Sequence, residues 1–118
     1  MYCFVLLFAF LYRGPIFKTF ALMRNQNLKG TVIVLDAGHG GYDPGARVSN
    51  QDEDEINLKI VLKLASYLER AGAEVRLIRS EDKDLSDEGV TNKKRSDMQH
   101  RAEILNQNDV TLFISVHC

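Results

Sequence analysis

The sequence has little of what marks several large classes of protein. Its formal net charge is −1 over 118 residues, so no excess of basic residues favours nucleic-acid binding. Its two cysteines, Cys3 and Cys118, stand at opposite ends and form neither a CxxC pair nor a disulfide framework. We interpret both as small apolar side chains that fill space. The spacing G-x-G-x-x-G and the ending G-K-[ST] are absent, which disfavours phosphate binding by a glycine loop.

Long hydrophobic runs are missing too, except at the amino terminus. Residues 1–12 are almost wholly apolar and uncharged, whereas a membrane-spanning helix needs about 20 apolar residues. The length suits the core of an export signal, about 7–15 residues. We therefore predict that residues 1–24 are a shortened export or anchor segment that associates with a membrane, and that residues 25–30 are a linker. The alternative is a strand or helix of the core.

The rest of the chain alternates between strand-like and helix-like segments. Apolar, β-branched runs predict strands over residues 31–35, 74–78 and 110–116, and helical spacing of apolar residues predicts helices over 55–71 and 94–107. Strands that alternate with helices are joined by right-handed crossovers and lie parallel. The sequence thus predicts an α/β fold. It is a β-α-β-α-β portion of a mostly parallel sheet, flanked by helices and truncated at its carboxyl end.

Each predicted helix has an apolar face. In the first helix this face comprises residues at intervals of about one turn, namely Ile56, Ile60, Leu64 and Leu68, widened by Val61, Ala65 and Ala71. In the second helix Met98, Ala102 and Leu105 share one face. Residues 47–54 are polar and predict a loop between the first strand and the first helix.

The residues with useful chemistry follow the strands. His39 lies in a glycine-rich loop after the first strand, and His117 follows the last strand. Because the carboxyl ends of parallel strands meet at one edge, both histidines should reach the same place. The first helix begins at that edge too, directly after the carboxylates of residues 52–55. Two histidines and one carboxylate are typical of a catalytic zinc site with a position left open for water.

Other residues of the loop have two interpretations each. Asp36 either holds a histidine ring in position or caps the loop. The glycines, Gly38, Gly40 and Gly41 among them, leave room around His39 for a metal and a substrate. The remaining histidine, His100, lies among polar residues of the second helix and is expected at the surface.

Several motifs together resemble one enzyme family. They are Asp36-Ala37-Gly38-His39-Gly40-Gly41, Asp43-Pro44-Gly45-Ala46, Glu53-x-x-x-Asn57, Gly72-x-x-Val75-x-x-x-Arg79, Arg101-x-x-x-x-Asn106 and Phe113-Ile114-Ser115-Val116-His117. The stretch is similar to the zinc-dependent N-acetylmuramoyl-L-alanine amidases of bacterial cell walls, the amidase_3 type, over residues 31–118. Asp82-x-Asp84-Leu85-x-x-Glu88-Gly89 looks like the germination-specific, spore-cortex type.

This resemblance implies a site and a reaction. The zinc ligands would be His39, Glu53 and His117, with Glu55 as the runner-up for the carboxylate. Residues 31–118 would be the amino-terminal part of the catalytic domain. The reaction would be hydrolysis of the amide between N-acetylmuramic acid and L-alanine in peptidoglycan. In the spore cortex this cleavage prepares muramic-δ-lactam, so the protein would be exported to the cell envelope or the spore cortex space.

One part of the family pattern has no match. The family carries a catalytic glutamate near its carboxyl end, and we expect that residue to lie beyond Cys118, so that this chain alone is inactive. The alternative function is a non-catalytic remnant that binds zinc or muropeptide. A carbohydrate deacetylase, which also uses histidine and carboxylate ligands, is a weaker alternative.

Overall fold

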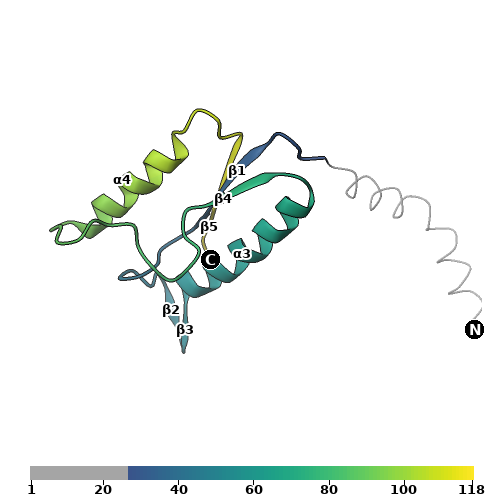
Figure 1. The fold of residues 1–118 in the computed structure, drawn as a ribbon. Helices are drawn as coiled ribbons and strands as arrows, with labels where there is room; N and C mark the ends of the chain where they lie inside the picture. Colours follow the sequence, from purple (N-terminus) through teal and green to yellow (C-terminus); the bar gives the residue numbers. More distant parts are fainter. Residues whose placement is uncertain (1–26) are drawn as a thin grey trace, which may run out of the picture.

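The computed structural model describes residues 27–118, and there the predicted alternation of strands and helices is confirmed (Figure 1). The elements are β1 (Val32–Ala37), β2 (Arg47–Val48), β3 (Gln51–Asp52), α3 (Glu53–Arg70), β4 (Glu74–Leu77), α4 (Lys93–Leu105) and β5 (Leu112–Val116). The predicted export segment lies outside the described residues. None of the helices in the described part is long and apolar enough to cross a membrane.

The sheet is parallel, with β1 in the centre between β4 and β5. Ile33 of β1 is paired with Val75 on one side and Leu112 on the other. The pairing with β5 continues past the end of β1, since Gly38 N–H donates to the carbonyl of Val116 at 3.0 Å. The predicted α/β class is therefore confirmed, and the loop after β1 starts beside the end of β5.

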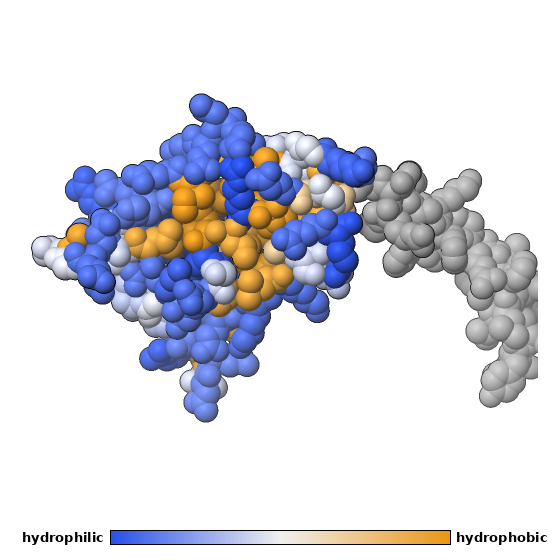
Figure 2. Space-filling model, in the orientation of Figure 1, coloured by the Kyte–Doolittle hydropathy of each residue, from blue (hydrophilic) through white to orange (hydrophobic). Residues whose placement is uncertain are grey.

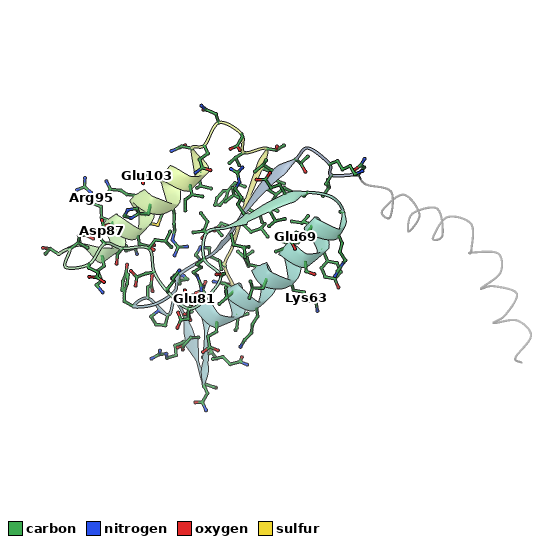
Figure 3. All side chains as sticks on the ribbon, viewed as in Figure 1. Lys63, Glu69, Glu81, Asp87, Arg95 and Glu103 are labelled. Atoms are coloured by element: carbon green, nitrogen blue, oxygen red, sulfur yellow. The ribbon has the colours of Figure 1, made fainter. Side chains whose placement is uncertain are left out.

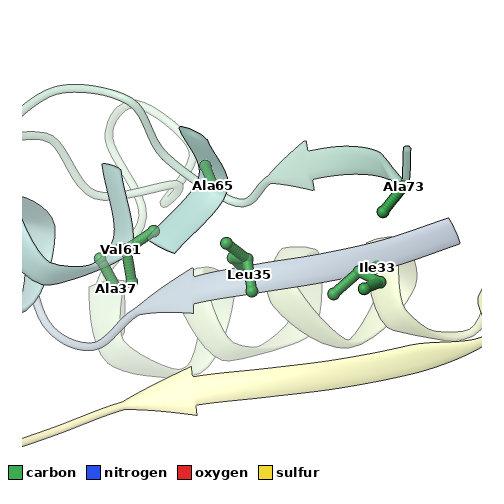
Figure 4. Packing of buried hydrophobic residues seen from close by; sticks show 6 residues of the cluster. All are labelled: Ile33, Leu35, Ala37, Val61, Ala65 and Ala73. Atoms are coloured by element: carbon green, nitrogen blue, oxygen red, sulfur yellow. The ribbon is translucent and has the colours of Figure 1, made fainter. Parts of the chain in front are cut away.

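The core lies between β1 and α3 (Figure 4). Alternate residues of β1, Ile33, Leu35 and Ala37, face Val61 and Ala65 of α3, and all five are buried. This arrangement follows from the period of two along a strand and of 3.6 along a helix. Because this contact between β1 and α3 is buried, it sets the position of the start of α3 relative to the end of β1.

The apolar stripe predicted for α3 is only partly correct. Val61 and Ala65, which were expected only to widen it, are the residues that pack deepest, whereas Ile60 is 44% exposed. The helix also begins at Glu53, two residues before the predicted start at Glu55. The earlier start matters because it brings Glu53 onto the first turn, facing the sheet edge.

A small hairpin replaces the polar loop predicted for residues 47–54. β2 and β3 are antiparallel, and Arg47 and Asp52 form an ion pair at 2.6 Å across them. Strands of two residues give no periodic pattern, which is why the sequence did not indicate them. The hairpin returns the chain so that Glu53 N–H donates to the carbonyl of Ala46 at 2.9 Å.

The helix α4 presents polar residues to the rest of the molecule. Its buried side chains are Ser96, Asp97 and Arg101, while Met98 of the predicted apolar face is 57% exposed. Charged side chains such as Arg95 and Glu103 point outward (Figure 3). The physical reason is that Arg101 attaches α4 to the end of β1, through a buried ion pair with Asp36 and a hydrogen bond to the carbonyl of His39.

Candidate metal centre

Three side chains converge at the carboxyl edge of the sheet. Ligand atoms of His39, Glu53 and His117 all lie within 4.8 Å of one another. Glu53 Oε1 is 3.3 Å from Nε2 of His39 and 3.2 Å from Nδ1 of His117. The two imidazole rings meet edge to face, with centroids 4.9 Å apart. The residues come from the β1 loop, the first turn of α3 and the end of β5, the three places that the sequence indicated.

The two distances from Glu53 to the histidines fit a zinc ion. Zinc–nitrogen bonds of about 2.0–2.1 Å and zinc–oxygen bonds of about 2.0–2.2 Å, at tetrahedral angles, put ligand atoms roughly 3.3–3.5 Å apart. The observed separations from Glu53 are 3.3 and 3.2 Å. Nitrogen and oxygen donors from two histidines and a carboxylate are also the donor types of catalytic zinc sites.

Glu53 and Glu55, the two candidates for the carboxylate, have different surroundings. Glu53 is buried and lies in the cluster. Glu55 is exposed and pairs with Lys59, one turn further along α3. The position of Glu53 on the inner side of the first turn distinguishes it from its neighbour.

Glu53 is held in its ionised form. The backbone N–H of Ala46 donates to Oε2 at 2.9 Å, and Asn57 and His117 add hydrogen bonds. The hydrogen bond from Ala46 is the largest cause that lowers the pKa of Glu53 to about 2, against a smaller rise from burial. The carboxylate is therefore available as a charged ligand across the whole physiological pH range.

Two glycines make room for these side chains. A methyl group on Gly38 would lie within 2.6 Å of Nδ1 of His117 and closer still to two other ring atoms. A methyl on Gly45, where φ is +68°, would lie 2.7 Å from both Glu53 and His39. A side chain at either position would displace a residue of the cluster, since real Cβ atoms do not come within 3 Å of other heavy atoms.

Gly40 and Gly41 serve a different purpose from the one expected. A side chain on Gly40 would meet the carbonyl of Lys83 at 2.6 Å, and one on Gly41 would meet Asp84 at the same distance. Gly41 N–H also donates to Asp82 at 2.7 Å. These two glycines therefore make room for the segment after β4, and Gly38 and Gly45 make room for the cluster.

Asp36 contacts neither histidine, so its interpretation as the residue that holds a histidine ring is wrong. Its carboxylate accepts hydrogen bonds from Arg101 and from Ser115, the latter at 2.9 Å. Asp43 lies beside the imidazole of His39 instead, with Oδ2 2.9 Å from Nδ1. The sequence could not separate these two acidic residues because both flank His39 at short range.

Buried polar side chains hold the backbone of the β1 loop. Arg79 is 1% exposed and donates to the carbonyls of Ala37 and Gly38 at 2.8 and 3.1 Å. Arg101 donates to the carbonyl of His39 at 2.8 Å, and Asn57 to that of Gly38 at 3.2 Å. Burial lowers the pKa of Arg79. These residues belong to the motifs found in the sequence, but the sequence did not indicate that they hold the loop backbone.

The remaining cysteine and histidine in the described part lie outside the proposed ligand set. Cys118 is exposed, and its thiol donates to Asn57 at 3.1 Å, so its interpretation as an apolar side chain that fills space is wrong. Its backbone N–H is 3.3 Å from Glu53. His100 lies on α4, partly exposed, with Nδ1 3.0 Å from the carbonyl of Ser96.

A groove opens beside the cluster, between α4 and β5. Its volume is about 390 Å³, and His39 and His117 line one end of it. Met98, Leu105 and Phe113 line the apolar part. Figure 2 shows that apolar side chains reach the surface across the middle of the molecule. Its volume falls within the roughly 300–1,000 Å³ that small-molecule sites occupy.

The fold and the cluster define a class of protein, in which a parallel α/β sheet carries a His-Glu-His set at its carboxyl edge. The family model of N-acetylmuramoyl-L-alanine amidases, Amidase_3, matches residues 33–118. The chain belongs to this family, and the resemblance found in its motifs is confirmed.

Individual relatives agree with this assignment. The germination-specific N-acetylmuramoyl-L-alanine amidase of Bacillus subtilis is 36% identical over 93 residues, which cover 76% of this chain. The amidase AmiA of Escherichia coli is 34% identical over 87 residues, 73% of this chain.

Solved structures give the same result. The CwlD amidase of Clostridioides difficile, solved in complex with the GerS lipoprotein, superposes with a TM-score of 0.70 at 39% identity over 74% of this chain. The catalytic domain of CwlV from Bacillus (Paenibacillus) polymyxa gives a TM-score of 0.62 at 31% identity, over 75% of this chain.

The chain spans less than half the length of these relatives. It covers 39% of the B. subtilis protein and 26% of the E. coli protein. Of the two solved chains it covers 47% and 45%.

Proposed function

We propose that this chain is the metal-binding part of a zinc-dependent amidase that hydrolyses the bond between N-acetylmuramic acid and L-alanine in peptidoglycan. The observation that carries the proposal is the convergence of His39, Glu53 and His117 within 4.8 Å at one sheet edge. Zinc held there supplies a Lewis acid for the amide carbonyl and an activated water. The groove beside the histidines gives the substrate access to that position.

The groove does not supply a free carboxylate for proton transfer. The three aspartates that line it are Asp36, Asp43 and Asp97. Arg101 pairs with Asp36 and Asp97, and His39 with Asp43. Hydrolysis of an amide needs a group that takes a proton from water and gives one to the leaving amine. Within residues 27–118 no lining carboxylate is free for that work, which supports the expectation that the chain alone is inactive.

The substrate of the whole protein is, in our proposal, spore-cortex peptidoglycan, cleaved toward muramic-δ-lactam. Support comes from the B. subtilis relative, which is a germination-specific amidase, and from the match to the C. difficile amidase. Residues 1–24 would then export or anchor the protein, residues 25–30 would be a linker, and residues 31–118 would begin the catalytic domain. The protein would act in the cell envelope or cortex space, with a lipoprotein of the GerS kind as a partner.

Zinc binding is tested first, on the 118-residue chain. We expect the chain to compete with a chromophoric chelator for zinc, and His39→Ala and His117→Ala to bind far more weakly. His100→Ala is the matched control, because it removes a histidine outside the cluster, and it should bind as the parent does. Equal zinc affinity in all four proteins would show that His39 and His117 do not bind the ion.

Activity is tested on cortex peptidoglycan by measuring new L-alanine amino termini. The chain alone should release none, and the chain fused to the remaining residues of the B. subtilis relative should release them in a zinc-dependent way. Zinc binding with no cleavage by either protein favours the non-catalytic remnant. Free acetate without new amino termini favours a deacetylase.

A further inference from the structure

Of the two histidines in the cluster, His39 is the one whose other ring nitrogen has a carboxylate partner. Its Nε2 faces Glu53 Oε1 at 3.3 Å, and its Nδ1 lies 2.9 Å from Asp43 Oδ2. His117 is different: its Nδ1 faces Glu53 at 3.2 Å, and its side chain is 53% exposed. The two histidines therefore enter the cluster with different degrees of constraint.

Asp43 is itself fixed in place. Its Oδ1 accepts a hydrogen bond from Gly45 N–H at 3.1 Å. Its backbone exchanges two hydrogen bonds with Gly40, at 2.8 and 3.3 Å. His39 directly precedes this turn and has a φ of +62°, a left-handed conformation that non-glycine residues rarely adopt. The loop thus holds the carboxylate and the imidazole in one fixed relation.

The chemistry of the pair determines which nitrogen of His39 carries the proton. Carboxylates face both ring nitrogens, but only the contact of Nδ1 with Asp43 is a hydrogen bond, whereas Nε2 and Glu53 are in charge contact at 3.3 Å. Since an ionised carboxylate only accepts hydrogen bonds, Nδ1 is the donor to Asp43. A neutral imidazole with its proton on Nδ1 has its lone pair on Nε2, which is the atom that faces Glu53.

We propose that Asp43 is a positioning residue that holds His39 as the Nδ1–H tautomer, with Nε2 presented to Glu53, before any ion binds. The proposal deepens the proposed function and rests on it, because it concerns how the same cluster is prepared for a metal. Histidines that bind metals generally donate their other ring N–H to a carboxylate or carbonyl, and loss of that partner weakens metal binding about 10–100-fold.

The direct test is the tautomer of His39 in the metal-free chain. Nitrogen-15 shifts of the imidazoles, measured at alkaline pH, should show His39 protonated on Nδ1 in the parent. Asp43→Ala removes the acceptor. Asp43→Asn keeps the shape and the Gly45 contact, but its amide can donate or accept and so no longer selects one tautomer. In both variants the Nδ1–H population should fall. An Nε2–H tautomer in the parent, or an unchanged tautomer in both variants, overturns the proposal.

Zinc affinity provides the second readout. Asp43→Ala should weaken zinc binding about 10–100-fold, and Asp43→Asn by less. Asp84→Asn is the control, because it removes one carboxylate near the same loop, where its contact is with Ser86. Affinity within twofold of the parent in Asp43→Ala overturns the proposal, and so does weaker binding with an unchanged tautomer. If the parent binds no zinc, the proposed function fails, and the tautomer alone decides the role of Asp43.

Discussion

Substitution of Gly38 by alanine should disable the metal centre while leaving the fold intact. The added methyl would lie within 2.6 Å of the His117 ring, well inside ordinary contact distance. Gly38 does not have a positive φ, so alanine brings no backbone strain at this position. The His117 side chain is 53% exposed and can swing toward solvent. We therefore expect the ring to move and the sheet to stay as it is.

The expected effect on zinc is the loss of one ligand. Structural zinc sites with four protein ligands have apparent binding free energies of about 10–16 kcal/mol, or about 2.5–4 kcal/mol per ligand. Gly38→Ala should therefore weaken zinc binding on the order of 100-fold to 1,000-fold. The cost to the free energy of unfolding should be small by comparison, because the displaced ring is not part of the apolar core.

A double-mutant cycle shows whether His117 is the cause. Zinc affinity is measured by chelator competition for the parent, Gly38→Ala, His117→Ala and the double variant. If the methyl acts only by displacing the ring, Gly38→Ala should change affinity by less than about twofold in the His117→Ala background. The urea midpoint of each protein, measured with chelator present, confirms that the fold is retained.

Two results would refute this reasoning. One is Gly38→Ala with the zinc affinity of the parent, which would mean that His117 does not bind the ion. The other is an equal loss in the presence and absence of His117, which would mean that the methyl disturbs the loop itself. Gly89→Ala is the control for adding a methyl group elsewhere: the methyl meets nothing within 4 Å, so zinc affinity should not change, although the positive φ of Gly89 strains the backbone locally.

Two further predictions concern stability. The pKa of Glu53 is about 2 in the fold against an ordinary value of 4.5, so its contribution is present above about pH 4.5 and is lost as the pH falls toward 2. In metal-free urea titrations the parent should lose more stability over that window than Glu53→Gln, and parallel pH profiles would contradict this. Arg101→Met leaves two buried aspartates without their cation and should lower the free energy of unfolding by about 3–5 kcal/mol. Arg47→Met, at an exposed pair, should lower it far less, and equal losses would show that burial is not the deciding factor.

Much of the fold could be predicted from local patterns. The apolar run of β1 and the alternation of β4 indicate strands, and Gly72 marks the end of α3 with a φ of +100°. Parallel pairing follows from the order of elements. From that order alone, His39 and His117 had to reach one edge of the sheet. The strand and helix patterns depend on residues that are close together in the sequence. The arrangement of the strands follows because short connections between these elements allow only one topology.

The tertiary structure decided which atoms meet. It placed Asp43 and not Asp36 against His39, and it turned Glu53 inward while Glu55 pairs with Lys59 at the surface. It also divided the glycines between the cluster and the segment after β4. A residue's type and spacing limit what it can contact. The choice among candidates a few residues apart depends on the exact turn of α3 and on the register between β1 and β5, which only packing of the whole domain sets.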